Sequence, residues 1–266
     1  MKQLQALIKQ GELASATEYA IGVLKEDPAN ADVRAVYIEL LCIQGALEKA
    51  DQQLDMMVRQ HPDFLVGAVN LRQLIRAASA RQDFYQGGMT ATLFAQPDAM
   101  FESMLKLRLA LKEQALPEAA MHAEQLEALR PDAGFDVNGD AVAQVRDLDD
   151  SLGGYLELFG TDGKYYLAKF SEIDSLQIKK PESLLDTVWR RAEIVLTEGP
   201  QGEVFIPMTY HDSIKVSERL GKETSWQQLD DYLVTGVGAK MLLAGDEAIP
   251  LADVQLFGAV HRAEVA

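Results

Sequence analysis

Apolar residues recur at intervals of three and four positions through the first half of the chain, whereas the second half holds short β-branched or aromatic stretches. The first spacing puts apolar side chains on one face of a helix. Leu4, Leu7 and Ile8 begin this pattern. It predicts helices over residues 3–10, 14–25, 31–44, 47–60, 64–81, 99–114 and 117–129.

The first four of these helices form a repeat. A spacing of 34 residues separates three pairs of residues: Gly11 and Gly45, Ala16 and Ala50, and Pro28 and Pro62. Glycine tolerates the dihedral angles of a turn, alanine lets two helices approach, and proline ends a helix. This period and order are typical of tetratricopeptide helix–turn–helix units.

The repeat weakens after its second unit. A third unit begins at residue 64, but residues 85–97 read as an irregular insertion with a turn at Gly87–Gly88. A late helix pair follows, in which Gln114 stands at the position of the turn glycine. We therefore expect two clear units, one broken unit and one degenerate unit.

After Pro131 the sequence predicts strands. YLELF (155–159) and YYLAKF (165–170) flank Gly160-Thr161-Asp162-Gly163, a strong hairpin signal. Further strands are predicted over residues 174–178, 187–196, 203–210, 240–245 and 254–258, with a helical turn within 213–221. The predicted fold class is α+β: a tetratricopeptide-like helical domain over residues 1–132, followed by a mostly β domain over residues 135–266.

Charge argues against nucleic acid as a partner. The chain has a net charge of −16; residues 1–132 hold 13 Lys and Arg against 18 Asp and Glu, and residues 133–266 hold 12 against 23. Both halves would repel a phosphate backbone. The single cysteine, Cys42, excludes an internal disulfide, and no signal peptide or membrane-spanning stretch is evident. We expect a cytoplasmic protein.

No segment of the sequence carries a convincing catalytic or cofactor-binding motif. His211 adjoins Asp212 and Ser213, but neighbouring residues on a strand or turn point in different directions. Gly236-Val237-Gly238 lacks the third glycine of a dinucleotide-binding loop. The four histidines, His61, His122, His211 and His261, have no paired ligand spacing. We predict no catalytic residue, no cofactor and no metal.

Stacked tetratricopeptide units form a concave face lined by the first helix of each pair, and such a face suits a helix or peptide from another protein. The repeat register places Gln5, Lys9, Asp32, Glu39, Cys42, Val69, Gln73, Arg76, Met104, Arg108 and Lys112 there. Our candidate partner-binding residues are Asp32, Glu39, Gln73, Arg76, Met104, Arg108 and Lys112.

The whole sequence resembles the ImpE family, also called SciE or TagJ, of accessory proteins of bacterial type VI secretion systems. The resemblance is carried by DLDDSLGGYLEL (147–158), GKYYLAKFSEIDSLQI (163–178), LLDTVWRRAEIVL (184–196), EVFIPMTYHDS (203–213) and GVGAKMLLAGDEAIPLADVQLF (236–257). It implies a cytoplasmic, non-enzymatic protein that contacts the contractile sheath, with the N-terminal helix of the small sheath subunit as its ligand.

Two alternatives remain open at this point. One is a hydrolase-type enzyme in the β domain that uses His211 with a carboxylate, which would require a cleft at that histidine. The other is a purely structural protein that forms oligomers.

Overall fold

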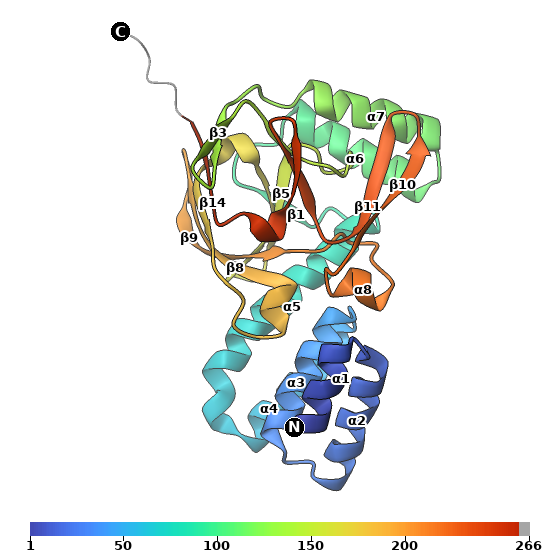
Figure 1. Cartoon of the computed structure of the whole chain (residues 1–266), viewed down its shortest axis with the longest axis vertical. Helices are drawn as coiled ribbons and strands as arrows, with labels where there is room; N and C mark the ends of the chain where they lie inside the picture. The colour runs from blue at the N-terminus through green and yellow to red at the C-terminus, as the bar shows by residue number, and fades with distance from the viewer. Residues whose placement is uncertain (261–266) are drawn as a thin grey trace.

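The computed structural model describes residues 1–260, which form a helical lobe and a strand-rich lobe joined by one long helix (Figure 1). The helical lobe holds α1 (Lys2–Gln10), α2 (Leu13–Glu26), α3 (Ala31–Ile43) and α4 (Leu47–Gln60). These bounds agree with the predicted helices to within one residue. The two clear repeat units are therefore confirmed.

The repeat residues have the roles expected from their chemistry. Gly11 and Gly45 end α1 and α3 with φ of 79° and 73°, a left-handed conformation that favours glycine. Ala16 and Ala50 are 0% exposed, because α2 and α4 approach their neighbours closely at these positions. Sequence and structure match position by position in this lobe.

The helix α5 (Leu65–Tyr85) follows the short 3-10 turn η1 (Pro62–Phe64) and runs from the helical lobe into the strand-rich lobe (Figure 1). Its burial changes along its length. Before Leu71 only Ala68 is buried, whereas Leu74, Ile75 and Phe84 in its second half are buried. One helix therefore belongs to both lobes.

The late helix pair, α6 (Ala99–Lys112) and α7 (Leu116–Ala128), does not continue the stack of repeats. It lies at the far end of the molecule, where α7 packs beside the ribbon of β10 (Thr224–Asp230) and β11 (Leu233–Gly238) (Figure 1). Gln114 occupies the glycine position of this pair with φ of 57°, so the turn geometry is kept without the glycine.

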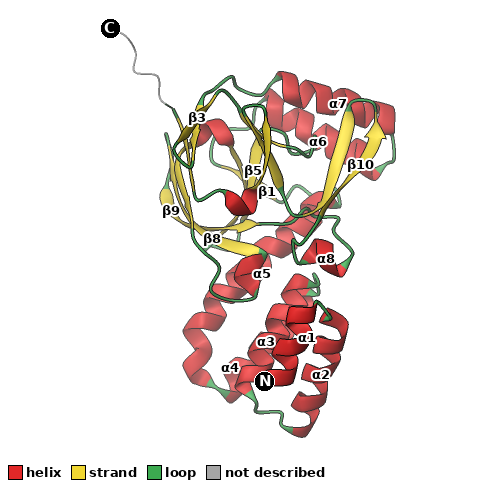
Figure 2. Cartoon of the chain, viewed as in Figure 1, coloured by secondary structure: helices red, strands yellow, loops and turns green. Residues whose placement is uncertain are grey.

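Strands form the second lobe, with the helices gathered on one side of it (Figure 2). A nine-stranded sheet has the order β1-β6-β5-β9-β8-β7-β14-β2-β3. Its strands are β1 (Ala91–Leu93), β2 (Phe135–Val137), β3 (Asp140–Val142), β5 (Tyr155–Gly160), β6 (Tyr165–Lys169), β7 (Ile173–Ile178), β8 (Trp189–Leu196), β9 (Gln201–Pro207) and β14 (Leu256–Ala259).

The remaining elements complete this lobe. A three-stranded sheet holds β4 (Val145–Asp147), β12 (Met241–Ala244) and β13 (Glu247–Pro250), and α8 (Val216–Arg219) supplies the predicted helical turn. The 3-10 turns are η2 (Phe170–Glu172), η3 (Leu185–Thr187) and η4 (Leu251–Asp253). The predicted β5–β6 hairpin is present and antiparallel.

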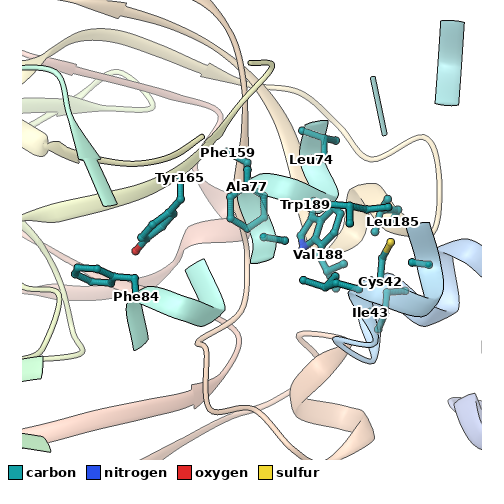
Figure 3. Packing of buried hydrophobic residues seen from close by; sticks show 14 of the residues in the cluster. Cys42, Ile43, Leu74, Ala77, Phe84, Phe159, Tyr165, Leu185, Val188 and Trp189 are labelled. Carbon is teal, nitrogen blue, oxygen red and sulfur yellow. The ribbon is translucent and has the colours of Figure 1, made fainter. Parts of the chain in front are cut away.

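Two findings differ from the expected organisation. The insertion at 85–97 contains β1, which pairs in parallel with β6, so a segment before residue 132 belongs to the large sheet. One hydrophobic core also spans both lobes: Cys42, Ile43 and Leu74 lie in the same cluster as Phe159 and Trp189 (Figure 3). The change from helices to strands near residue 132 is therefore not a break in packing.

Candidate functional site

Four of the seven candidate partner-binding residues lie on the first helices of repeat units two and three, α3 and α5. Asp32 is exposed in the first turn of α3, directly after the capping Asn30, whose side chain accepts a hydrogen bond from the Val33 amide at 3.1 Å. By the 34-residue period, Val66 of α5 has the same place in its unit as Asp32. It is 74% exposed, so this end of the face is open.

Further along α3, Glu39 is half-buried beside η3 of the strand-rich lobe. Burial raises the pKa of Glu39, a hydrogen bond from the Leu185 amide opposes that rise, and the nearby Asp186 adds to it. The carboxylate therefore already binds a segment of its own chain. Glu39 marks the point where the repeat face changes from open to covered.

Gln73 and Arg76 lie on α5 against the turn of the β5–β6 hairpin. A Cβ added to Gly163 in this turn would lie 2.5 Å from Gln73 Oε1 and 3.5 Å from Arg76 Cβ. Gly163 has φ of 86°, so both the turn conformation and the close approach of α5 favour glycine there. Gln73 is half-buried and Arg76 is exposed.

The three candidates on α6 do not share that face. Met104 is 0% exposed and Arg108 is 6% exposed, so the expectation that these side chains line an open face is wrong for this structure. Arg108 lies with its guanidinium 4.0 Å from the centre of the Tyr85 ring and donates to the Ser151 carbonyl at 3.1 Å. Lys112 is exposed, near Gly87.

Met104 and Arg108 are buried because α6 packs on the strand-rich lobe instead of on the repeats. The period alone assigns the late helix pair to a fourth stacked unit, but the insertion carrying β1 moves it onto the strand-rich lobe. The structure thus keeps Asp32 and Glu39 on α3 and Gln73 and Arg76 on α5, the first helices of their repeat units. It separates Met104, Arg108 and Lys112 from them (Figure 1).

The start of α5 carries exposed apolar side chains. Phe64, Leu65, Val66 and Val69 are 43%, 52%, 74% and 46% exposed. Residues three and four apart lie on the same side of a helix, so Val66, Val69, Gln73 and Arg76 form one line. We call Leu65, Val66, Val69, Gln73 and Arg76 the α5 stripe.

The other end of the repeat face is closed by the protein itself. Three residues of this segment are buried: Leu185 at the start of η3, Val188 directly after η3, and Trp189 at the start of β8. They share a core with Cys42 and Ile43 at the end of α3 (Figure 3). Burial also raises the pKa of the Cys42 thiol, so this cysteine is an inert core residue.

A separate polar cavity lies between the lobes near His211. Its volume is about 670 Å³, and its lining includes Gly45, Arg81, Trp189 and His211. A smaller cavity of about 230 Å³ lies on the other side of His211. The cleft that the enzyme alternative requires at His211 is therefore present, and the His211 side chain is 19% exposed and stacks on Tyr85 with 4.1 Å between ring centres.

The surroundings of His211 favour the neutral imidazole. Burial lowers its pKa to about 4, and the neighbouring Arg81 acts in the same direction. The hydroxyl of Ser213 is already engaged, because it donates to the Tyr210 carbonyl at 2.7 Å and accepts from the Gly238 amide at 2.8 Å. Asp212 Oδ1 lies 3.9 Å from His211 Nε2. The three residues do not form a nucleophile–base–acid relay.

Next to this cavity lies a buried cluster of charges centred on Glu157 of β5. Glu157 is 0% exposed and accepts two hydrogen bonds of 2.7 Å from Arg81, one from Nε and one from Nη2. Lys240 Nζ lies 2.5 Å from Oε2, which also accepts from Arg81 Nη2, and the Tyr165 hydroxyl donates to Oε1 at 2.7 Å. Burial alone would raise the pKa of Glu157, but Arg81 and Lys240 hold it well below its usual value.

No sequence pattern predicts this cluster, since Arg81 and Glu157 are 76 positions apart and the family segment DLDDSLGGYLEL (147–158) that contains Glu157 does not indicate its partner. Within residues 1–260 no group of three or more His, Cys, Asp or Glu side chains is placed to hold a metal ion. His261 lies outside the described residues. In the same part of the chain, no helix combines the length and apolar character needed to cross a membrane.

Comparisons with known proteins identify the two parts of the chain. Residues 139–257 match the family model described as ImpE protein, and residues 7–72 match a tetratricopeptide repeat model. The predicted family resemblance and repeat type are thus confirmed. The chain is also 28% identical over 257 residues to the type VI secretion system accessory component TagJ of Pseudomonas aeruginosa, covering 92% of this chain and 87% of that protein.

A solved structure shares the whole fold. The crystal structure of protein VPA1032 from Vibrio parahaemolyticus is 38% identical in sequence and superposes with a TM-score of 0.94. The match covers 97% of this chain and 98% of that chain. The arrangement of both lobes is therefore shared with a relative.

Proposed function

Since this chain belongs to the ImpE family through its strand-rich half and carries tetratricopeptide repeats before it, we propose that it is a non-enzymatic accessory protein of a bacterial type VI secretion system. It works in the cytoplasm as an adaptor. Its helical repeats bind the N-terminal helix of the small contractile-sheath subunit.

The observation that carries this proposal is the exposed apolar surface on the repeats. Soluble proteins place large apolar side chains inside, and a group of them on the surface marks an interaction site. Val66 is 74% exposed and Leu65 is 52% exposed in adjacent positions. A face of this kind on stacked helices suits an amphipathic helix.

The contacts of His211 support an adaptor over a hydrolase. An imidazole with a pKa of about 4 is a weak base at neutral pH, and the Ser213 hydroxyl bonds to backbone groups instead of to His211. Around this cavity Arg219 donates to the Gln44 carbonyl of the repeats at 3.0 Å, and Arg81 donates to the Thr209 carbonyl at 3.0 Å. Their role in the proposal is to fix the strand-rich lobe against the repeats.

The proposal is tested by calorimetric titration of the full-length chain with a peptide that spans the first helix of the small sheath subunit. A scrambled peptide of the same composition serves as control. We expect saturable binding near one peptide per chain for the native sequence and none for the scrambled one. Absence of binding by the native peptide would overturn the proposed function.

A further inference from the structure

A buried arginine of α6 lacks the paired counter-charge that such a side chain usually has. Arg108 is 6% exposed, and it forms no ion pair within 4.0 Å with any carboxylate of residues 1–260. Arg81 is buried nearby, but it binds Glu157 through two hydrogen bonds. Fully buried charges in proteins are normally paired with an opposite charge. Arg108 can therefore still pair with an anion from outside the chain.

The hydrogen-bond donors of Arg108 are also largely unused. Its Nη2 donates to the Ser151 carbonyl at 3.1 Å, whereas Nε and Nη1 have no hydrogen-bond partner in the described part of the chain. The guanidinium stacks on the Tyr85 ring, with 4.0 Å between Cζ and the ring centre. Stacking uses the flat face of the guanidinium, so these N–H groups in its plane still lack an acceptor.

Arg108 lines the cavity of about 230 Å³ that lies where α6 faces the ribbon of β10 and β11 (Figure 1). Lys112 lines the same cavity and is exposed. Because residues four apart lie on the same side of a helix, α6 presents two positive charges here. The volume is smaller than the pockets of about 300–1,000 Å³ that hold drug-sized molecules, so a ligand of this cavity is small.

The ribbon opposite α6 contributes two uncharged polar side chains. Gln227 of β10 and Thr235 of β11 are directly opposite in the antiparallel register, so their side chains lie on the same face of the ribbon. Both line the cavity, and neither side chain has a hydrogen-bond partner among the residues that the structure describes. An amide and a hydroxyl can each donate to an oxygen atom. Donors therefore approach the cavity from both α6 and the ribbon.

Two carboxylates line the cavity as well and limit the charge of a ligand. Asp149 is 6% exposed, and its oxygens accept hydrogen bonds from the Ser151 and Gly236 amides at 2.8 and 3.0 Å. The Asp212 side chain is 77% exposed. Both would repel a ligand with several negative charges. The lining thus favours a small oxyanion over a polyphosphate.

We infer that this cavity binds one small oxyanion, a carboxylate or inorganic phosphate, with Arg108 and Lys112 as its counter-charges. The oxygens of the ligand accept hydrogen bonds from the guanidinium, and Gln227 and Thr235 donate from the other side. The bound anion connects α6 to the β10–β11 ribbon. This site lies apart from the repeat face, so the inference does not depend on the proposed function.

The test is calorimetric titration of the full-length chain with inorganic phosphate and, separately, with sodium acetate, in a buffer that contains neither. Arg108→Gln removes the buried charge, and Lys112→Gln removes the exposed charge without changing the core. Lys106→Gln is the matched control, because Lys106 is an exposed lysine of the same helix that does not line the cavity. Circular dichroism and thermal unfolding check that each variant is folded.

We expect one anion per chain, with a Kd below about 1 mM for at least one of the two probes. Affinity should fall at least about tenfold in Arg108→Gln and at least about threefold in Lys112→Gln. It should change by less than about twofold in Lys106→Gln. The probe that binds more tightly identifies the class of oxyanion.

Asp212→Asn should have the opposite effect and raise the affinity, because it removes a negative charge beside the anion. This variant and Lys112→Gln decide the question if Arg108→Gln does not fold. Absence of saturable binding of both probes would overturn the inference and leave the proposed function intact. Equal weakening by Lys106→Gln and Lys112→Gln, or unchanged affinity in both Lys112→Gln and Asp212→Asn, would also overturn it.

Discussion

Arg81 of α5 and Glu157 of β5 form a two-pronged ion pair, with Nε–Oε1 and Nη2–Oε2 distances both 2.7 Å. The Glu157 side chain is 0% exposed and that of Arg81 is 10% exposed. The pair joins the helix that emerges from the repeats to β5, the third strand of the large sheet.

Breaking this pair should destabilise the whole protein. Glu157→Gln leaves Arg81 buried without its counter-charge and leaves Lys240 with Asp147 alone, 3.9 Å away, which costs about 3–5 kcal/mol. Urea unfolding followed by circular dichroism measures the loss. Arg59→Ala is the control, because Arg59 pairs with Asp55 at the surface with 78% of its side chain exposed, and such pairs contribute little. Equal losses for the two variants would contradict the role given to Glu157.

His211 should make stability depend on pH. Its pKa is lowered from 6.5 to about 4 in the folded state, so the unfolded chain takes up a proton first as the pH falls. The stabilisation is complete above pH 6.5 and is lost as the pH falls through 4. The total loss attributable to this group is up to about 3 kcal/mol.

The measurement compares wild type with His211→Gln by urea unfolding at several pH values. Subtracting the two curves removes the contribution of other groups, including Asp147, whose pKa burial raises to about 7. The difference should change between pH 6.5 and 4 and stay flat above 7. A difference that is constant with pH would show that the imidazole titrates normally.

Gln114 should be a site where glycine stabilises the protein. Its φ of 57° is costly for a residue with a Cβ, whereas Gly45 has the same role in unit two with no such cost. Gln114→Gly should gain about 0.5–1 kcal/mol after the extra freedom of the unfolded chain is allowed for. Glu113→Gly, at φ of −80°, should instead lose a similar amount in the same unfolding measurement. A gain for both variants, or a loss for both, would contradict this account of the turn.

Residues 1–132 alone should fold only in part. In the full chain Phe84 packs against Tyr165 with 5.7 Å between ring centres, and Arg81 pairs with Glu157, so both lose their partners in this fragment. Hydrogen exchange should show faster exchange in the second half of α5 and in α6. Peptides from α2 and α3 should keep the protection they have in the full chain. Unchanged protection of α5 and α6 would show that the helices fold independently of the strands.

Much of the fold was predictable because its signals are local. The repeat residues Gly11 and Gly45, and the hairpin at Gly160–Gly163, each act within one turn, and all have the predicted structure. The sequence pattern does not predict β2, β3, β4 or β10. The strands β2 and β3 are only three residues long and pair across Asn138-Gly139, and β10, which pairs with the adjacent β11, has the polar sequence TSWQQLD, so these hairpins lack the longer apolar alternation that indicates a strand. Only β4 depends on a distant partner, β12.

The candidate residues also differ in how far local sequence signals determine their surroundings. Asp32, Glu39, Gln73 and Arg76 could be assigned to the repeat because the period continues through α5. Met104 and Arg108 were misassigned because burial of α6 depends on the strand-rich lobe, which a period cannot reveal. The pairing of Arg81 with Glu157 was equally beyond reach, since it depends on the position of α5 over the sheet.

The central claim is that the repeats bind the first helix of the small sheath subunit, and it is tested most directly by co-purification with the intact subunit. The full-length chain is expressed with either the complete sheath subunit or one that lacks only its first helix. The account predicts that the complete subunit co-purifies in stoichiometric amounts and that the shortened one does not. Equal recovery of both subunits, or recovery of neither, would contradict it.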